Sequence, residues 1–375
     1  SRAVERRTYW AMGTLLHRQP RHPLLPAWSQ RALALLDADD RDLSVLLGGY
    51  LVNWFLWRGE THAARDVIER IAAWTDSALS PMVAILWSCA VALYHSVQGR
   101  TEDCRRCVEA GLGVAERTGL HAFDCLLAVQ MARCSLVAGQ PADAGYWLAR
   151  MATTMRSPLD GAVHRHLQCN AAAQRGDWQQ ALAHARSALA MAHDSGMPFL
   201  EAHCHLDLAR ALIGCGERSE WAAHLDAARG IGQAMDCRVV DYLCLETEAV
   251  AAFDRGEDAA GYERLAAALA LSRAMDGATW LVSGPRVSAR LYDRALAVGI
   301  EVEHVQRLIR RHRLSPPDPA TAAEAWPWPV RVYTLGRFEL LRDDAPLRSA
   351  GKAQHKPLEL LKYLCACGAQ AIHRD

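Results

Sequence analysis

The sequence lacks any apolar run of the ~18 residues that a membrane-spanning helix needs, so we expect no membrane segment. It also lacks an excess of either charge. The sequence contains 42 Lys and Arg residues and 42 Asp and Glu residues. Because these charges balance, composition alone does not indicate a surface that binds nucleic acid or membrane. Residues that favour strands are sparse before Val330, which argues against a sheet-based fold for most of the chain. Without a recognisable secretory signal, we expect a cytoplasmic protein.

Motifs for several kinds of chemistry are missing as well. There is no GxxxxGK[ST] phosphate loop, no HExxH zinc motif and no evident set of paired catalytic carboxylates or Ser/His/Asp residues. The 12 cysteines are scattered along helical patterns, and we expect reduced thiols that pack as small apolar side chains. We therefore predict that the protein is not an enzyme and that it needs no cofactor or metal.

Three short patterns look like ligand sets but favour a simpler interpretation. Cys104-x-x-Cys107 has metal or redox spacing, yet Cys104 falls at a small core position of the repeat described below. Two His-x-His pairs are also present: His164 with His166, and His203 with His205. Residues two apart on a helix point about 200° away from each other, so neither pair is expected to hold one ion from a single face.

What the sequence does contain is an internal repeat of about 40 residues. A glycine recurs with spacings of 40, 40, 37, 40, 40 and 43 residues, at Gly59, Gly99, Gly139, Gly176, Gly216, Gly256 and Gly299. Small or apolar residues follow most of these glycines at positions five, nine and twelve, which share one face of a helix. Another small or β-branched residue lies seven positions before the first six glycines. Such a period predicts a solenoid of hairpins, each with a helix A, a tight turn at the glycine and a helix B.

The best copy of the turn, Gly176 to Ala181 (GDWQQA), resembles the start of the second helix in the tetratricopeptide repeat (TPR). The resemblance implies a mainly α, TPR-like α/α solenoid of about seven hairpins, with helices longer than those of the usual 34-residue unit. Residues 1–38 are expected to form two helices that cover one open end. In the last hairpin, helix A is expected at 279–298, and Arg311 occupies a core position, so we expect a solvated capping face.

Residues 315–329 (SPPDPATAAEAWPWP) contain five prolines and cannot form a regular helix or a central strand, so we expect a linker there. The predicted domains are therefore a repeat domain at 1–314, this linker, and a second domain at 330–375. In the second domain we expect strands from Val330 onward interrupted at Gly336, a turn at Asp343–Pro346, a third strand from Leu347, and then a helix.

The segment VRVYTLGRFELLRDDAPLRSAGKAQHKPLELLKYL resembles the start of the OmpR-type winged helix, particularly as used in SARP and MalT-like regulators. The resemblance implies the N-terminal part of a DNA-binding domain, truncated before its recognition helix, in a piece of a longer protein. DNA would be a partner of the complete domain only, so this piece is expected to bind DNA weakly or not at all. Lys352, Lys356 and Lys362 are candidates for contacts to the DNA backbone.

The inner stripe of helices A is the candidate ligand or partner groove. Its residues in the middle and later repeats are His166, Asn170, Gln174, His203, Arg210, Glu246 and Asp254, with Asn53 and Arg133 in earlier repeats. Resemblance to MalT-like sensors implies that a small-molecule inducer or a protein partner binds there; an ordinary hydrated face is an equal alternative.

We therefore predict a transcriptional regulator fragment whose repeat domain senses an inducer or partner and controls the DNA-binding domain. The alternative is a TPR-like protein–protein interaction scaffold with no DNA role. Self-association into a homo-oligomer is compatible with either function, and the identities of the inducer and the DNA target stay open.

Overall fold

The computed structural model describes residues 2–37, 39–75, 79–217, 220–277, 283–334, 338–342, 345–347 and 355–366. The chain separates into two compact units, Ser1–Glu324 and Ala325–Asp375. The boundary between them falls inside the proline-rich segment 315–329. Each unit is described by itself below.

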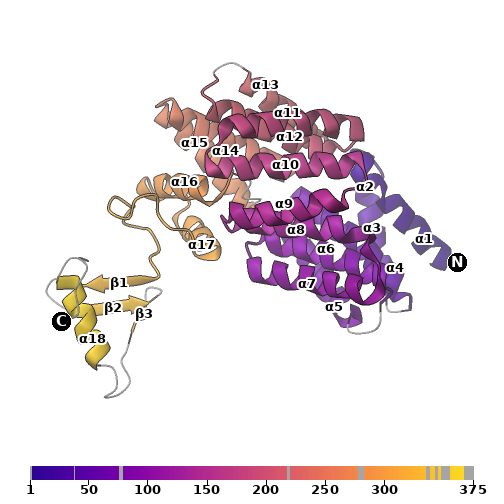
Figure 1. The fold of residues 1–375 in the computed structure, drawn as a ribbon, viewed down its shortest axis with the longest axis horizontal. Helices are drawn as coiled ribbons and strands as arrows, with labels where there is room; N and C mark the ends of the chain where they lie inside the picture. Colours follow the sequence, from indigo (N-terminus) through magenta and orange to yellow (C-terminus); the bar gives the residue numbers. More distant parts are fainter. Residues whose placement is uncertain are drawn as a thin grey trace. The chain divides into compact units, whose positions relative to one another are not determined.

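The first unit is built from antiparallel helical hairpins (Figure 1). Helices A are α4 (Arg41–Arg58), α6 (Pro81–Val97), α8 (Asp124–Val137, after the 3-10 turn η1 at His121–Phe123), α10 (Pro158–Arg175), α12 (Pro198–Gly214), α14 (Arg238–Asp254) and α16 (Pro285–Ala297). Helices B are α5 (Thr61–Thr75), α7 (Thr101–Thr118), α9 (Pro141–Thr154), α11 (Trp178–Ser195), α13 (Trp221–Ala234), α15 (Asp258–Ala274) and α17 (Val302–His312). The predicted TPR-like α/α solenoid is confirmed, although the last helix A begins at Pro285 rather than at residue 279.

The turn between helix A and helix B has the same backbone conformation in every hairpin. All seven repeat glycines lie in the left-handed region, with φ between +69° and +81°. At Gly176 the space around an added Cβ is open, so the backbone angle alone makes glycine the favoured residue. Each hairpin therefore makes the same tight reversal between its helix A and its helix B.

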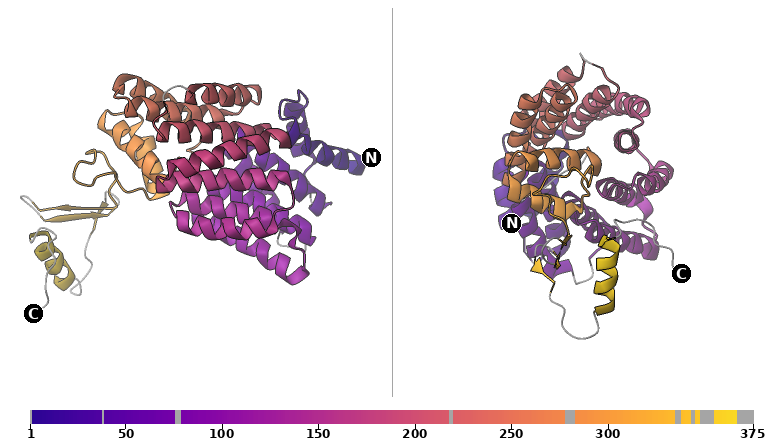
Figure 2. Two further views of the ribbon diagram at one scale, coloured as in Figure 1. Left: turned by 45° about the horizontal axis from the view of Figure 1, so that its top comes forward. Right: turned by 90° about the vertical axis from the view of Figure 1, so that its left-hand side faces the viewer.

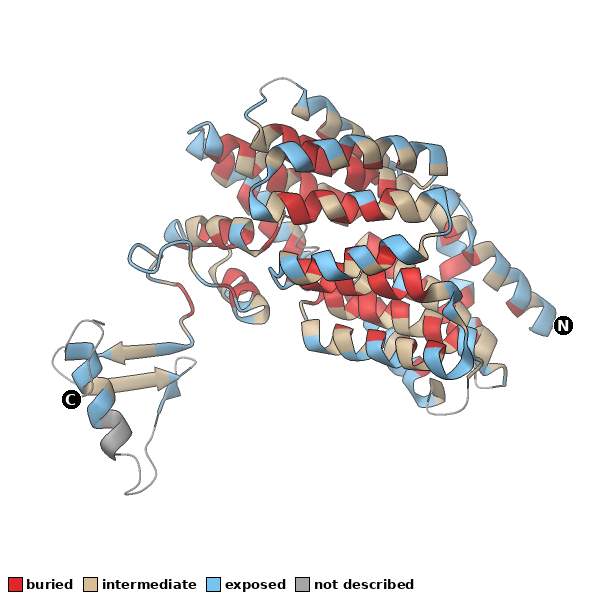
Figure 3. Ribbon diagram, viewed as in Figure 1, coloured by how far each residue is buried: buried red, intermediate tan, exposed pale blue. Residues whose placement is uncertain are grey.

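The interfaces between the paired helices are tightly packed. The residues seven positions before the first six glycines are at most 2% exposed: Val52, Ala92, Ala132, Cys169, Ala209 and Ala249. Small side chains at this position let the two helices of a hairpin approach closely. Cys104 is fully buried at the matching core position of helix B, as the packing interpretation of the CxxC motif requires. Figure 3 shows that the buried residues are concentrated in these hairpins.

The solenoid closes on itself within the first unit. The Cys237 thiol, just before α14, donates to the backbone oxygen of Trp57 at the end of α4, with 2.9 Å between S and O. The Thr61 hydroxyl donates to the Met275 oxygen at 2.8 Å. One hydrophobic cluster contains residues from α3–α6 and from α12–α15. The right-hand view of Figure 2 shows the resulting ring of helices. The repeat period does not predict this closure.

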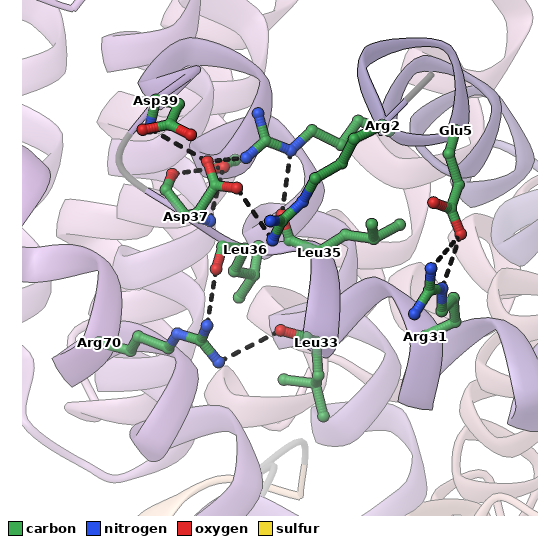
Figure 4. Close-up of polar contacts among 11 residues, drawn as sticks. Arg2, Glu5, Arg31, Leu33, Leu35, Leu36, Asp37, Asp39 and Arg70 are labelled. Carbon is green, nitrogen blue, oxygen red and sulfur yellow. Dashed lines mark hydrogen bonds and ion pairs between the residues drawn. The ribbon is translucent and has the colours of Figure 1, made fainter.

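The N-terminal segment forms three helices rather than the predicted two: α1 (Arg2–Gly13), α2 (Leu15–Arg18) and α3 (Leu25–Leu35). Arginines bind the backbone oxygens at the C-terminal end of α3 (Figure 4): Arg6 donates to Leu35, and Arg70 of α5 donates to Leu33 and Leu36. The last carbonyls of a helix lack partners within the helix and attract cations. These contacts hold α1 and α3 against the first hairpin.

The last hairpin is packed against the ring, which corrects the predicted solvated cap. His304 of α17 is buried, and its Nε2 lies 3.1 Å from the Ser272 hydroxyl oxygen. Arg311 donates to the backbone oxygens of Asp276 and Gly277, at 2.8 and 3.1 Å. A Cβ at Gly99 would lie 2.5 Å from the His312 ring, so α17 reaches the turn of the second hairpin.

The second unit contains a small antiparallel sheet of order β1-β2-β3, followed by one helix. Its elements are β1 (Val330–Tyr333), β2 (Glu339–Arg342), β3 (Ala345–Pro346) and α18 (His355–Ala366). Val330 pairs with Arg342 and Leu341 with Pro346. The third strand therefore precedes Leu347, where it was predicted to begin. The predicted interruption at Gly336 and the Asp343–Asp344 part of the predicted turn fall outside the described residues.

Candidate functional site

A partly open cavity of about 660 Å³ lies within the first unit. Side chains from α1, α2, α4, α6, α8, α10 and α12 line it, so it runs across the first five hairpins and the N-terminal helices. Small-molecule sites in proteins typically occupy ~300–1,000 Å³ and are mostly apolar. The cavity thus has the size of a ligand site.

The repeat explains which side chains reach the cavity. Six residues before the turn glycine, successive helices A place Asn53, Leu93, Arg133 and Asn170 on its wall. The next residue in this row, Arg210, lies outside the lining. A row of equivalent positions thus forms one wall, and its chemistry differs from repeat to repeat.

Aromatic side chains form another wall. Trp57 of α4 and Phe199 of α12 stack with ring centroids 4.3 Å apart and planes 10° from parallel. His17 of α2 meets Trp57 edge-on, with centroids 5.4 Å apart. Burial, and secondarily Arg18, lowers the pKa of His17 to about 4, so this ring is neutral at neutral pH. The wall is therefore apolar and joins the first hairpin to the fifth.

His166 and Asn170 form a buried polar group on α10 together with Asp207 of α12. His166 Nδ1 lies 2.6 Å from Asp207 Oδ2. Asn170 Nδ2 donates to the His166 backbone oxygen at 2.8 Å and to Asp207 Oδ2 at 3.4 Å. An ionised carboxylate only accepts hydrogen bonds, so the His166 ring donates to Asp207 through Nδ1.

His203 lies next to this group on the cavity wall. Its ring centroid is 5.9 Å from that of His166 and 4.5 Å from that of Phe199. Burial holds the pKa of His203 well below its usual value, and the charges of His166, Arg133 and Arg210 add to the effect. His203 is therefore neutral at neutral pH.

Arg133 and Gln130 lie one turn apart on α8, and both line the cavity. Burial lowers the pKa of Arg133 to about 10, which leaves the guanidinium charged at neutral pH. The buried Oε1 of Gln130 has no hydrogen-bond partner among the described residues. These two side chains place a positive charge and an amide with unused hydrogen-bonding capacity on the wall.

Five of the residues predicted for the inner stripe come together in the cavity lining: Asn53, Arg133, His166, Asn170 and His203. The other four lie beyond it, near the segment that leads into α16. Gln174 Nε2 donates to the Leu136 oxygen at 3.0 Å, and its side chain packs against Gly284. Asp254 is exposed and pairs with Arg290 of α16 at 3.2 Å.

Glu246 and Arg210 form a separate buried network. Glu246 accepts hydrogen bonds from Tyr242 at 3.1 Å and Ser283 at 2.6 Å. Arg210 NH2 lies 3.7 Å from Glu246 Oε2, and its Nε donates to the Thr247 hydroxyl at 3.1 Å. These contacts tie α12 and α14 to Ser283, two residues before α16, so in this structure the two charges hold helices together.

Several lining residues were not among the predicted groove residues, notably Trp10, His17, Gln130 and the apolar residues of α6. Trp10 and His17 reach the cavity only because α1 and α2 dock on the ring, which no repeat signal reveals. The α6 residues had a usable signal, because PMVAILWSCAVALYHSV contains no charged side chain. A helix that is apolar all round is covered on both sides.

None of the helices in the described ranges combines the length and apolar character needed to cross a bilayer.

The His-x-His pairs diverge as predicted. His166 and His203 line the cavity, whereas His164 Nε2 contacts the Leu148 oxygen at 3.0 Å and His205 Nδ1 lies 3.0 Å from His224 Nδ1. Across the described parts of the chain, no group of three or more His, Cys, Asp or Glu side chains is placed to hold a metal ion.

Of the three lysines proposed for DNA contacts, only Lys362 has a described side chain. Its Nζ lies 2.8 Å from Glu359 Oε1 and 5.2 Å from the centre of the Phe338 ring. The side chains of Lys352 and Lys356 fall outside the described residues. The charge of Lys362 is therefore partly compensated within the second unit.

Fold and cavity together define a TPR-like helical-repeat protein that curves around a cavity. No family model matches the sequence, and comparison with curated proteins finds no match. Among solved structures, the chain is similar to the Rap protein in "Crystal Structure of Rap Protein Complexed with Competence and Sporulation Factor". The TM-score is 0.58 at 10% sequence identity, over 83% of this chain and 87% of that chain. At this identity the likeness shows the helical-repeat fold alone.

Proposed function

We propose that the first unit is a non-catalytic binding module that takes an apolar ligand, a small molecule or the end of a peptide, into the cavity. The observation that carries the proposal is the cavity itself, with about 660 Å³ and a mostly apolar lining that includes a few converging polar groups. The Rap protein of similar fold was solved in complex with competence and sporulation factor, which supports a receptor role for such a fold.

Binding is expected to act on the ring through its seam. Trp57 and Phe199 both line the cavity and both belong to the contact that closes the ring. A ligand that binds the closed ring better than an open one shifts the population towards closure. Partners of the first unit, or the part of the chain that follows α17, then respond to the change in closure.

A titration with the neutral fluorophore N-phenyl-1-naphthylamine tests the binding function. We expect saturable binding of one molecule per chain. Leu126→Trp adds bulk inside the cavity, where Leu126 is 40% exposed, and is expected to weaken binding at least about tenfold. Leu24→Trp makes the same change at a residue that is 55% exposed outside the cavity and serves as the matched control. Equal binding by both variants contradicts the proposal.

A second candidate function is the regulator predicted from the sequence, in which this module controls a winged-helix DNA-binding domain. The observation in its favour is the three-stranded antiparallel sheet followed by α18 in the second unit. Leu360, Tyr363 and Leu364 lie on one face of α18 and are 40–59% exposed. Such an apolar stripe is typical of a helix that packs against further helices.

Selection of DNA from a random duplex library by the product of the complete reading frame tests the regulator function. We expect one enriched sequence whose affinity changes in Leu126→Trp, whereas residues 1–375 by themselves are expected to bind only weakly and without sequence preference. If the product of the complete reading frame enriches no sequence, the interaction-scaffold function is favoured instead.

A further inference from the structure

We propose that the cavity binds a ligand in which an aromatic ring lies next to an amide, and that Gly49 of α4 makes room for the ring while Asn53 pairs with the amide. The proposal rests on the proposed binding function and deepens it by naming the class of ligand. Four features of α4 and α6 carry it: the missing side chain at Gly49, the small residue opposite, the rings on either side, and the carboxamide one turn away.

Helix α4 turns one face to the cavity, and Gly49 lies in the middle of that face. The lining residues of this helix are Val45, Leu46, Gly49, Tyr50, Asn53 and Trp57. Their spacing follows the helical period, so they share one face. A glycine in the interior of a helix is less favourable than an alanine. Its presence at the centre of this face therefore needs a structural reason.

Packing between helices explains the neighbouring glycine but not Gly49. A Cβ at Gly48 would overlap the side chain of Ile71, so Gly48 allows α5 to approach α4 closely. A Cβ at Gly49 would meet only one atom within 4 Å, the Cβ of Ala90 at 3.9 Å, which is an ordinary van der Waals contact. Gly49 is not among the glycines with positive φ either. Glycine at this position therefore contributes open space on the cavity side of α4.

Gly49 and Ala90 together form a recess in the cavity wall, which we call the Gly49 bay. Ala90 of α6 also lines the cavity. Tyr50 follows Gly49 on α4, and Trp87 lies one turn before Ala90, with its Cζ3 3.6 Å from the Cβ position of Gly48. Both rings are half-buried and line the cavity. Aromatic side chains bind flat apolar groups through large contact areas, so the bay favours an aromatic ring of the ligand.

Asn53 lies one turn after Gly49 on the same face of α4. Within the described ranges its carboxamide forms no hydrogen bond with another residue, although it lines the cavity. Asn170, at the same repeat position in α10, is instead bonded to the His166 oxygen and to Asp207. A carboxamide offers an N–H donor and an oxygen acceptor in either of its orientations, and an amide of the ligand offers the complementary pair. Asn53 therefore selects an amide beside the ring.

The ring and the amide can belong to a small organic amide or to an aromatic residue of a peptide, and two pairs of probes distinguish these sources by isothermal titration calorimetry. The small-molecule pair is 4-phenylbutanamide and octanamide. The peptide pair is acetyl-Gly-Phe-Gly-amide and acetyl-Gly-norleucine-Gly-amide. Each pair keeps the amide and replaces the ring by a linear alkyl chain. We expect the ring probe of at least one pair to depend on the Gly49 bay, and that pair identifies the source.

Substitutions of Gly49 test the ring. Gly49→Val fills the bay and is expected to weaken the ring probe at least about tenfold while changing its linear partner less than about twofold, because a slim chain can bend around the added side chain. Gly49→Ala adds one methyl group and is expected to weaken the ring probe about threefold.

Stability separates this loss from unfolding. Because alanine favours a helix more than glycine does, Gly49→Ala should raise the melting temperature by about 1–2 °C while it weakens binding. Gly145→Ala makes the same change at an exposed glycine of α9 outside the cavity and is the matched control. It should raise the melting temperature without changing the affinity of any probe.

Asn53→Leu tests the amide. The ketone 5-phenylpentan-2-one has the shape of 4-phenylbutanamide with a methyl group in place of the amide nitrogen. The ratio of amide to ketone affinity should fall at least about threefold in Asn53→Leu, because the hydrogen bonds to the ligand amide are lost. For the peptide, the corresponding comparison replaces the amide after Phe by an ester. Gln233→Leu removes an exposed carboxamide of α13 outside the cavity and is the matched control.

The outcomes separate this proposal from the broader one. If Gly49→Val weakens both probes of each pair equally, or neither, the assignment of the ring is overturned. An unchanged ratio in Asn53→Leu overturns the assignment of the amide. Failure of all four probes while N-phenyl-1-naphthylamine still binds in the cavity overturns both and leaves the binding function standing. If the fluorophore binds equally to Leu126→Trp and Leu24→Trp, the binding function itself fails.

Discussion

Trp57 on the first helix A stacks face to face on Phe199 on the fifth, with ring centroids 4.3 Å apart and planes 10° from parallel. Both side chains are less than 10% exposed, and both line the internal cavity. One stacked pair thus joins the first and fifth hairpins of the solenoid and forms part of the candidate binding site. Closure of the ring and formation of the site are therefore the same packing event.

Truncation of the seam is expected to open the ring. Phe199→Ala should lower the free energy of unfolding by about 3–5 kcal/mol, the usual cost of removing a buried aromatic side chain. It should also weaken N-phenyl-1-naphthylamine binding, because the wall is lost. Denaturant unfolding and the fluorophore titration measure the two effects. Tyr146→Ala, at an aromatic residue that is 61% exposed, is the control and should change stability by less than about 1 kcal/mol. Intact fluorophore binding in Phe199→Ala would contradict the role of the seam.

Gly176→Ala tests the conformation of the repeat turn. Gly176 has φ of +81° with open space around the Cβ position, so the substitution introduces backbone strain of about 1–2 kcal/mol without a clash. Gly145 lies within α9, also with open space, and Gly145→Ala is expected to stabilise the protein by about 0.5–1 kcal/mol. Thermal unfolding of the two variants should therefore shift in opposite directions. A shift in the same direction would show that the turn does not require glycine.

Glu246→Gln tests whether the buried network at α14 is structural. Glu246 is 2% exposed and accepts hydrogen bonds from Tyr242 and Ser283, with Arg210 at 3.7 Å. Removing its charge leaves the guanidinium without its counter-ion and is expected to cost about 1–3 kcal/mol. Because Glu246 does not line the cavity, fluorophore affinity should stay within about twofold of the wild type. A large loss of binding at unchanged stability would instead place Glu246 in the site.

Buried histidines predict a loss of stability in acid. Burial, with Arg307 as the next cause, lowers the pKa of His304 to about 4 from its ordinary value of 6.5. Between these pH values the unfolded chain binds the proton and the folded protein does not, so the free energy of unfolding falls as pH decreases from 6.5 towards 4. His304→Gln should make this fall less steep in urea titrations. His62→Gln, at a histidine whose side chain is 62% exposed, is the control. An unchanged slope in His304→Gln would contradict the assignment.

Much of the candidate site could be located from the repeat, and part of it could not. His166, Asn170 and His203 were predicted from the inner stripe of helices A, because a helix face follows from sequence spacing alone. Gln174, Arg210, Glu246 and Asp254 share that stripe but lie outside the cavity, near the segment leading into α16 and α16 itself. The position of the segment that leads into α16 decides which stripe residues it covers. That position depends on tertiary contacts, which helix spacing does not encode.

The sequence by itself determined the hairpins, their turns and their order, because each hairpin depends on short-range spacing: a glycine at positive φ, a small residue seven positions earlier and an apolar helix face. Only the tertiary structure decided that the ring closes and that α1 and α2 complete the cavity. The curvature of a solenoid accumulates from small rotations between neighbouring repeats. No single repeat therefore reveals whether the first hairpin will meet the fifth and sixth.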